Sequence, residues 1–265
     1  MLKRGVMKER KGLIIICCVL WLWPASARAA LPFITDDTGT QGAGKFQIEA
    51  AGEYNREKET TSGIIVKESG SGLVPTLTYG VMDQIDLFIA VPYVWYSAEE
   101  EGAGTVRENG AADSIAGMKW RCYEREGMSI GIKPFLIIPT GNEEKGLGSG
   151  ETGYGTIVIM TKVEGPWTVH ADFGYLRNQN EPDERKDLWQ ASAAVTFKVV
   201  KNLVLGADMG IVTNRDKTSR EEPVYLLGGM VYSVNDDLEL SLGLKAGLNA
   251  SEKDWSVLPG VTHRF

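Results

Sequence analysis

The feature that most constrains the fold of this chain is the rhythm of the connections between its extended segments. After residue 44, stretches of alternating apolar and polar residues are joined by connections that are long and short in turn. The long ones are NREKETTSGIIVKESG, SAEEEGAGTVRENGA, PTGNEEKGLGSGETG, NQNEPDERKD and NRDKTSREE, with a shorter NASEK last, and the short ones are VMDQ, EREG, EGP, VKN and NDD. This rhythm puts every long loop at one end of a sheet, as in transmembrane barrels and not in Greek-key sandwiches.

The segments themselves have the hydropathy of strands with two different faces. In LELSLGLKAGL, for example, leucines occupy every second position opposite Glu239, Ser241 and Lys245. Twelve strands are expected, at roughly 45–55, 70–80, 85–96, 112–122, 128–139, 154–163, 167–177, 188–199, 203–213, 223–233, 238–248 and 254–265. A strand of about ten residues tilted by about 45° crosses a bilayer. Trp and Tyr residues gather near the strand ends, the levels that membrane interfaces favour.

The last strand, DWSVLPGVTHRF, indicates that the sheet closes on itself. Its apolar row runs from Trp255 to Phe265, with His263 on the same side. An unpaired sheet edge in lipid costs several kcal/mol for each unpaired group. The last strand is therefore expected to pair with the first, which gives an all-β, twelve-stranded antiparallel transmembrane β-barrel. The terminal Phe265 also resembles the signal by which the barrel-assembly machinery recognises outer-membrane barrels.

The residues before the first strand divide into two parts. Residues 1–29 have a basic start, an apolar run of about a dozen residues and a small-residue site, the layout of a signal peptide cleaved after Ala29. Residues 30–44 are expected to form a periplasmic lead-in, with a short plug in the barrel mouth as the alternative, and residues 45–265 the barrel. This layout predicts export to the outer membrane of a Gram-negative cell, as a monomer surrounded by outer-membrane lipids.

Composition excludes several classes of function. Without residues 1–29 the chain has 22 basic and 34 acidic residues, a net charge of −12, which argues against nucleic acid as a partner. Cys122 is then the sole cysteine, so no intrachain disulfide can form. The G-x-G-x-x-G at 148–153 precedes a strand instead of a helix and predicts a loop, not a nucleotide site. No cofactor and no metal site is expected.

The polar face of the strands supplies the candidate site, which is the lining of the lumen. His170 and Asp172 lie two apart on one strand, and a hydrolase reading is open, but no nucleophile motif accompanies them. A hydrogen-bond network in the lumen is the preferred interpretation, and no catalytic residue is assigned. The candidates for lining the lumen carry both signs of charge and are Lys45, Glu49, Lys133, His170, Asp172, Glu239, Lys245 and Arg264.

The segment LPFITDDTGTQGAGKFQIEAAGEY resembles the opening of the bacterial outer-membrane family labelled "putative MetA pathway of phenol degradation". The matching residues are Pro32, Phe33, Thr35, Asp36, Asp37, Thr38, Gly39, Thr40, Gly42, Gly44, Phe46, Gln47 and Glu49, followed by the strand around Asp113 and Lys119 and by Pro139, Thr140 and Gly141. The resemblance spans nearly the whole chain after the signal peptide. It implies an outer-membrane barrel with a link to the uptake of aromatic or other hydrophobic compounds.

Three functions stay open from the sequence. The first is passive passage of small solutes through a narrow, charge-lined barrel of a size between filled eight-stranded barrels and open porins. The second is a structural or assembly-related barrel with an occluded lumen. The third and least favoured is an outer-membrane hydrolase.

Overall fold

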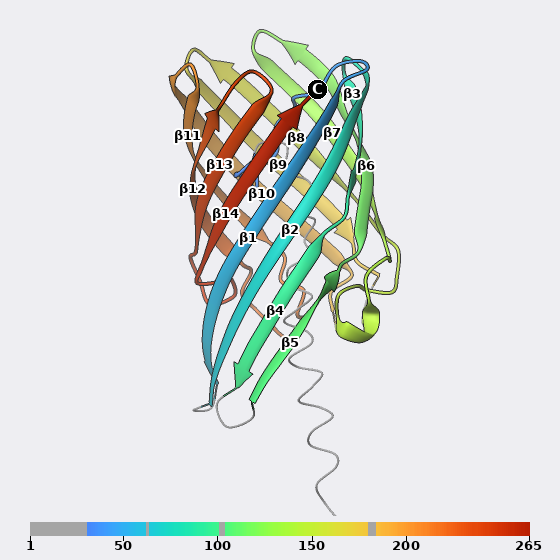
Figure 1. The fold of residues 1–265 in the computed structure, drawn as a ribbon, viewed down its shortest axis with the longest axis vertical. Helices are drawn as coiled ribbons and strands as arrows, with labels where there is room; N and C mark the ends of the chain where they lie inside the picture. The colour runs from blue at the N-terminus through green and yellow to red at the C-terminus, as the bar shows by residue number, and fades with distance from the viewer. Residues whose placement is uncertain (1–30, 62–63, 101–103, 180–183) are drawn as a thin grey trace, which may run out of the picture.

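The computed structural model describes residues 31–61, 64–100, 104–179 and 184–265, so the expected signal peptide lies outside the described residues. The chain forms one antiparallel barrel, closed because β1 pairs with both β2 and β14 (Figure 1). The elements are β1 (Phe46–Thr61), β2 (Ile64–Met82), β3 (Ile85–Ala90), β4 (Tyr93–Glu100), β5 (Gly104–Ala111), β6 (Ser114–Arg125), β7 (Met128–Ile138), the 3₁₀ turn η2 (Glu143–Lys145), β8 (Gly153–Glu164), β9 (Trp167–Arg177), β10 (Asp187–Val200), β11 (Leu203–Val212), β12 (Val224–Ser233), β13 (Leu238–Gly247) and β14 (Trp255–Arg264). No helix among these residues is long and apolar enough to cross a membrane.

The fourteen strand segments make a closed barrel of twelve strands, which confirms the predicted fold. β3 and β4 are two halves of one strand, since both pair with β2, and β5 and β6 are likewise the halves that pair with β4 and β3. The first break falls at Val91 and Pro92. Proline has no N–H to give to a sheet, which accounts for an interruption there.

Two connections that we expected to be loops are instead strand. The β1–β2 pairing continues to Thr61 opposite Ile64, and the β4–β5 pairing continues to Glu100 opposite Gly104. These hairpins extend past the neighbouring strands at the end of the barrel away from the C-terminus (Figure 1). Strands outside a membrane need no apolar face, so their polar sequences lack the alternation by which strands were recognised. We call that end the long-loop rim, and the end that carries Phe265 the C-terminal rim.

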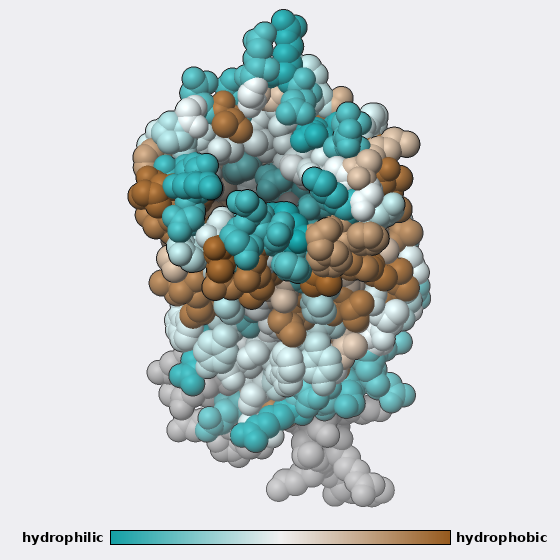
Figure 2. Space-filling model, turned by 45° about the horizontal axis from the view of Figure 1, so that its top comes forward, coloured by the Kyte–Doolittle hydropathy of each residue, from teal (hydrophilic) through white to brown (hydrophobic). Residues whose placement is uncertain are grey.

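The outer surface is apolar around the waist of the barrel (Figure 2). Outward side chains alternate with inward ones as predicted: Ile89 is 44% exposed, whereas its neighbour Ala90 is 0% exposed. Aromatic side chains mark both borders of the apolar band. Phe46, Tyr79 and Phe265 pack together near the C-terminal rim, and Tyr54 packs on Trp255 toward the other rim. This banding is that of a transmembrane barrel.

Closure of the barrel reaches the last residue of the chain. Phe46 and Phe265 exchange two backbone hydrogen bonds, of 2.8 and 3.0 Å between nitrogen and oxygen. His263 projects outward with the apolar row, and its ring lies 5.5 Å from that of Phe265. The terminal phenylalanine is therefore a fully paired strand residue, as the sequence indicated.

Candidate functional site

Residues 31–44, called the crossing segment below, lie inside the barrel. Their backbone N–H groups donate to inward side chains of β3, β8, β9 and β11, so the segment runs across the lumen. This is the plug arrangement, the alternative to a lead-in outside the barrel. An irregular backbone can be buried only where its N–H groups find hydrogen-bond acceptors. The inward side chains of the strands supply these acceptors, which explains why the segment lies in the lumen.

Asp36 forms the most densely bonded point of the crossing segment. Its carboxylate is fully buried and accepts from Lys119 Nζ on β6 at 2.8 Å and from Lys133 Nζ on β7 at 2.7 Å. Its backbone N–H donates to Asp172 Oδ2 on β9 at 2.7 Å. Lys119 also donates to the carbonyl oxygen of Asp37. Asp36 thus ties three strands of the wall together through one residue of the segment.

A second anchor lies on β11, where Asp208 is buried. One of its oxygens accepts the N–H groups of Ile34 and Thr35 at 2.6 and 2.8 Å. The other accepts the hydroxyls of Thr35 at 2.8 Å and of Tyr225 at 3.2 Å. With four donors the carboxylate is well satisfied, and three of the four come from the crossing segment.

Smaller contacts hold the remainder of the crossing segment. Thr38 donates its N–H to Thr161 Oγ1 and shares a hydrogen bond with the hydroxyl of Ser129. The N–H of Gln41 donates to the carboxylate of Asp86, at 3.1 and 3.2 Å from its two oxygens. Near the C-terminal rim a Cβ added at Gly80 would lie 1.9 Å from the carbonyl oxygen of Gly42, so only glycine permits this approach.

The eight predicted lumen residues lie on the inward side of the strands or at the C-terminal rim. Glu49, Lys133, His170 and Asp172 are buried, and Glu239, Lys245 and Arg264 are half-buried. Lys45 is exposed at the C-terminal rim, just before β1. His170 Nδ1 shares a hydrogen bond with Thr161 Oγ1, and Asp172 accepts from Asp36, so both residues belong to the network that holds the crossing segment. Among the described residues no group of His, Cys, Asp and Glu is arranged to hold a metal ion.

The charged side chains of the lumen brace one another. Lys245 lies 3.4 Å from Glu53 and 3.2 Å from Glu252, and Arg264 lies 2.9 Å from Glu239. Arg264 and Glu239 join the neighbouring strands β14 and β13 near the C-terminal rim, whereas Lys245 on β13 reaches past β14 to β1 and also to the loop after β13 near the long-loop rim. Burying a charge is costly unless it is paired, so the mixed signs read from the sequence correspond to a cross-braced wall.

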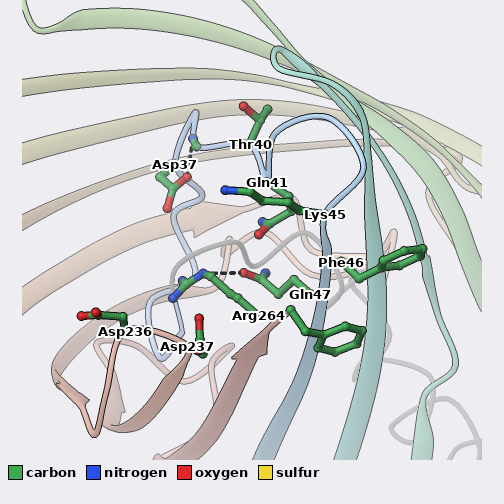
Figure 3. Close-up of a pocket in the computed structure, with 11 residues that line it drawn as sticks. Asp37, Thr40, Gln41, Lys45, Phe46, Gln47, Asp236, Asp237 and Arg264 are labelled. Carbon is green, nitrogen blue, oxygen red and sulfur yellow. Dashed lines mark hydrogen bonds between the residues drawn. The ribbon is translucent and has the colours of Figure 1, made fainter.

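A pocket of about 400 Å³ opens between the crossing segment and the C-terminal rim (Figure 3). Its lining is mostly polar: Asp37, Gly39, Thr40, Gln41, Lys45, Phe46, Gln47, Asp236, Asp237, Arg264 and Phe265. Along one side of it Arg264 Nε on β14 donates to Gln47 Oε1, at the paired position of β1, at 3.0 Å. The lumen is therefore hollow up to the crossing segment from this side, and the segment forms the floor of the hollow.

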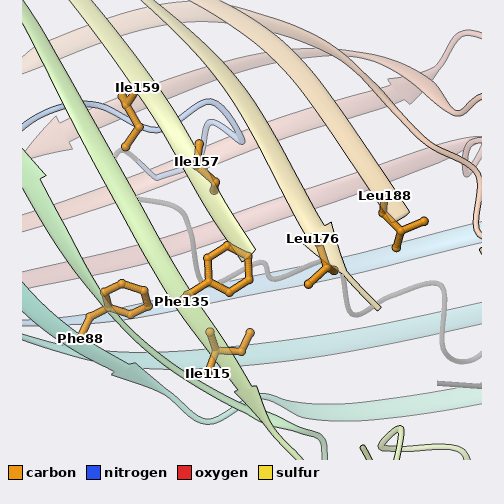
Figure 4. Close-up of a cluster of buried hydrophobic side chains, with 7 residues drawn as sticks. All are labelled: Phe88, Ile115, Phe135, Ile157, Ile159, Leu176 and Leu188. Atoms are coloured by element: carbon orange, nitrogen blue, oxygen red, sulfur yellow. The ribbon is translucent and has the colours of Figure 1, made fainter. Parts of the chain in front are cut away.

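One wall of the lumen is apolar, which the sequence did not reveal. Seven buried side chains project inward from β3 and from β6 to β10 (Figure 4), and we call them the apolar wall: Phe88, Ile115, Phe135, Ile157, Ile159, Leu176 and Leu188. Lys133 Nζ lies 4.7 Å from the centre of the Phe88 ring, so the wall borders the Asp36 network. A signal for it is present in β8, whose IVIM is apolar on both faces, so that its inward residues are apolar as well.

Residues 32–265 match the family described as Putative MetA-pathway of phenol degradation. The chain belongs to this family. The match includes the crossing segment as well as the barrel, so both are covered by the family pattern. No sequence among the curated proteins matches this chain.

Solved structures share the fold at low sequence identity. The COG4313 outer membrane channel from Pseudomonas putida F1 superposes with a TM-score of 0.70 at 13% identity, over 86% of this chain and 98% of that one. The translocator domain of autotransporter NalP from Neisseria meningitidis gives 0.59 at 12% identity, over 96% and 98% of the two chains. The KdgM porin gives 0.54 at 9% identity, over 83% and 99%. These likenesses show the fold of an outer-membrane barrel.

Proposed function

We propose that this protein is an outer-membrane channel for passive passage of small solutes, with aromatic or hydrophobic compounds as the preferred class. The observation that carries the proposal is that the lumen is blocked by a separate segment instead of by side chains of the wall. A segment held by hydrogen bonds and ion pairs can leave while the twelve strands stay closed. The family to which the chain belongs, described by phenol degradation, and the neighbour named an outer membrane channel agree with this reading.

The two sides of the lumen favour solutes that have both an apolar body and a polar group. The apolar wall offers Phe88, Phe135 and neighbouring aliphatic side chains, and the opposite side offers paired charges. Binding sites for small molecules combine these features, with apolar area for affinity and a few polar groups for orientation. A purely ionic lumen would favour ions, and a purely apolar one would exclude water.

One observation favours the occluded structural barrel as a second candidate. The crossing segment is anchored at three carboxylates, Asp86, Asp172 and Asp208, and at two lysines through Asp36. If those contacts never break in the membrane, no solute passes through the barrel. Asp172 accepts a hydrogen bond from the crossing segment, and His170 is bonded to Thr161, which also accepts from the segment. These contacts support a bracing role for both residues and give no support to a hydrolase.

Conductance in planar bilayers separates the two candidates. The chain 30–265 should show single-channel steps, and a variant that lacks residues 31–41 should show larger steps with the barrel intact by heat-modifiable gel mobility. A silent wild type beside a leaking deletion variant would favour the occluded barrel. Silence of both chains would reject passage altogether, because the lumen would then be closed without the crossing segment.

We further propose that both rims follow the usual topology, with the long-loop rim outside the cell and the C-terminal rim in the periplasm. The long hairpins support this, because long connections of such barrels face outward. Assembly by the barrel-assembly machinery through the strand that ends at Phe265, and a monomeric state, complete the proposal.

A further inference from the structure

The first residues of the crossing segment occupy a fitted pocket in the wall. Phe33 is 2% exposed and packs with Tyr225, Leu227 and Leu258 of β12 and β14. Inward glycines on neighbouring strands leave the space for it and for Pro32. A Cβ at Gly206 would lie 2.6 Å from Phe33 Cζ, and one at Gly229 would lie 2.6 Å from Pro32 Cγ and 3.2 Å from Phe33 Cε1. The pocket has the size of a single aromatic ring.

A polar group stands next to this pocket. Asp208 is two residues from Gly206 on the same face of β11, and Tyr225, which packs against Phe33, donates its hydroxyl to Asp208. While the crossing segment is docked, Asp208 accepts three further hydrogen bonds from Ile34 and Thr35. When these residues withdraw, a buried carboxylate loses three of its four donors, which is costly unless another donor takes their place.

The geometry points to a binding site for a monocyclic aromatic compound that carries a hydroxyl donor, occupied in the closed state by Phe33. The ring takes the place of the Phe33 ring among Tyr225, Leu227 and Leu258. Its hydroxyl donates to Asp208 in place of the backbone of the crossing segment. Solute and segment therefore compete for one site, and an arriving phenol stabilises the open lumen. The site rests on the proposed function only in that a solute must reach the lumen.

The chemistry of the pocket predicts which aromatic compounds it binds more tightly. A site that must satisfy a buried acceptor discriminates against an analogue that lacks the donor, whereas an apolar hole does not. Phenol should therefore bind at least about tenfold more tightly than toluene, which has the ring without the hydroxyl. A ligand that binds a state present only part of the time shows an affinity reduced by that fraction. Removing the competing residues should therefore strengthen binding.

The test measures binding of phenol and toluene by NMR to the full barrel in detergent micelles, where passage plays no part. A variant that lacks residues 31–35 keeps the anchors from Asp36 onward and should bind phenol at least about tenfold more tightly than the wild-type chain 30–265. In that background Gly229→Val fills the pocket and should abolish binding. Gly228→Val is the matched control: Gly228 faces outward with no atom within 4 Å of an added Cβ, and binding should be kept.

Three results would overturn the site. These are equal phenol affinity with and without residues 31–35, retained binding in the Gly229→Val variant, and equal affinity for phenol and toluene. Heat-modifiable mobility identifies variants that fail to fold, and the Gly228→Val variant then shows whether a valine is tolerated on this strand at all. Failure of passage would appear separately, as a silent bilayer recording from a protein that still binds phenol.

Discussion

Replacing Asp36 by asparagine should release the crossing segment without unfolding the barrel. The carboxylate is fully buried between Lys119 and Lys133, at 2.8 and 2.7 Å. Removing one partner of a buried ion pair typically costs about 3–5 kcal/mol, because the remaining charge is left uncompensated. Since about 1.4 kcal/mol is a factor of ten, the docking equilibrium of the segment should weaken by roughly two to three and a half powers of ten.

The assay is single-channel recording, in which Asp36→Asn should increase the fraction of time spent in the larger conductance state. Asp37→Asn is the matched control, because the neighbouring carboxylate is partly exposed and lies 3.8 Å from Lys119. It should change the recording less than Asp36→Asn, because the single contact of Asp37 with Lys119 is longer than the two contacts that Asp36 makes with Lys119 and Lys133. If the two variants behave alike, Asp36 does not hold the segment and the reasoning fails.

Three further predictions concern the membrane, the topology and assembly. Ile89→Arg, on the outward face near mid-barrel, should lower barrel stability by about 2–4 kcal/mol, while Leu205→Arg, outward near the C-terminal rim, should cost about 0–1 kcal/mol. Equal losses in urea unfolding into lipid would contradict the depth assignment. Epitope tags in 97–111 and 140–153 should be labelled on intact cells, and labelling only after permeabilisation would reverse the orientation. Deletion of Phe265, which removes the two backbone bonds to Phe46, should lower the heat-modifiable fraction recovered from cells; an unchanged fraction would remove the C-terminal residue from the assembly signal.

The membrane-spanning part of the fold could be predicted because lipid imposes a simple rule on it. Each outward side chain in the band must be apolar, so the alternation at Leu87, Ile89 and Val91 identifies both the strand and its face. Outside the membrane this rule does not apply, and strands there could not be predicted from the alternation. The extensions of β1 and β2 beyond the membrane do not alternate between apolar and polar residues, so their sequence predicts a loop. Hydrophobic alternation arises when the two faces of a strand have different surroundings. A polar hairpin in water has the same solvent on both faces, so it shows no alternation.

The interior was harder to predict, because burial there depends on the crossing segment. Parity placed Glu49, Lys133 and Asp172 on the inward face, but their partners belong to a segment far away in sequence. Ala90 shows the same limit: its inward direction follows from the sequence, but its packing partners do not. In the structure Ala90 packs with Leu31, Ala51 and Val74. A charge at Ala90 should therefore displace the crossing segment, so the site is a poor control for lipid contact.

The pairing of β1 with β14 has a consequence for the order of folding. Arg264 and Gln47 are bonded across this seam although they are 217 residues apart in the chain, and contacts of such separation form late because of the loop that they close. The crossing segment is joined directly to β1, one of the two strands at the seam. Its acceptors on β3, β8, β9 and β11 stand on a sheet that can exist before closure. Laying the segment across that open sheet avoids threading it through a finished ring, so the lumen is already blocked when the barrel closes.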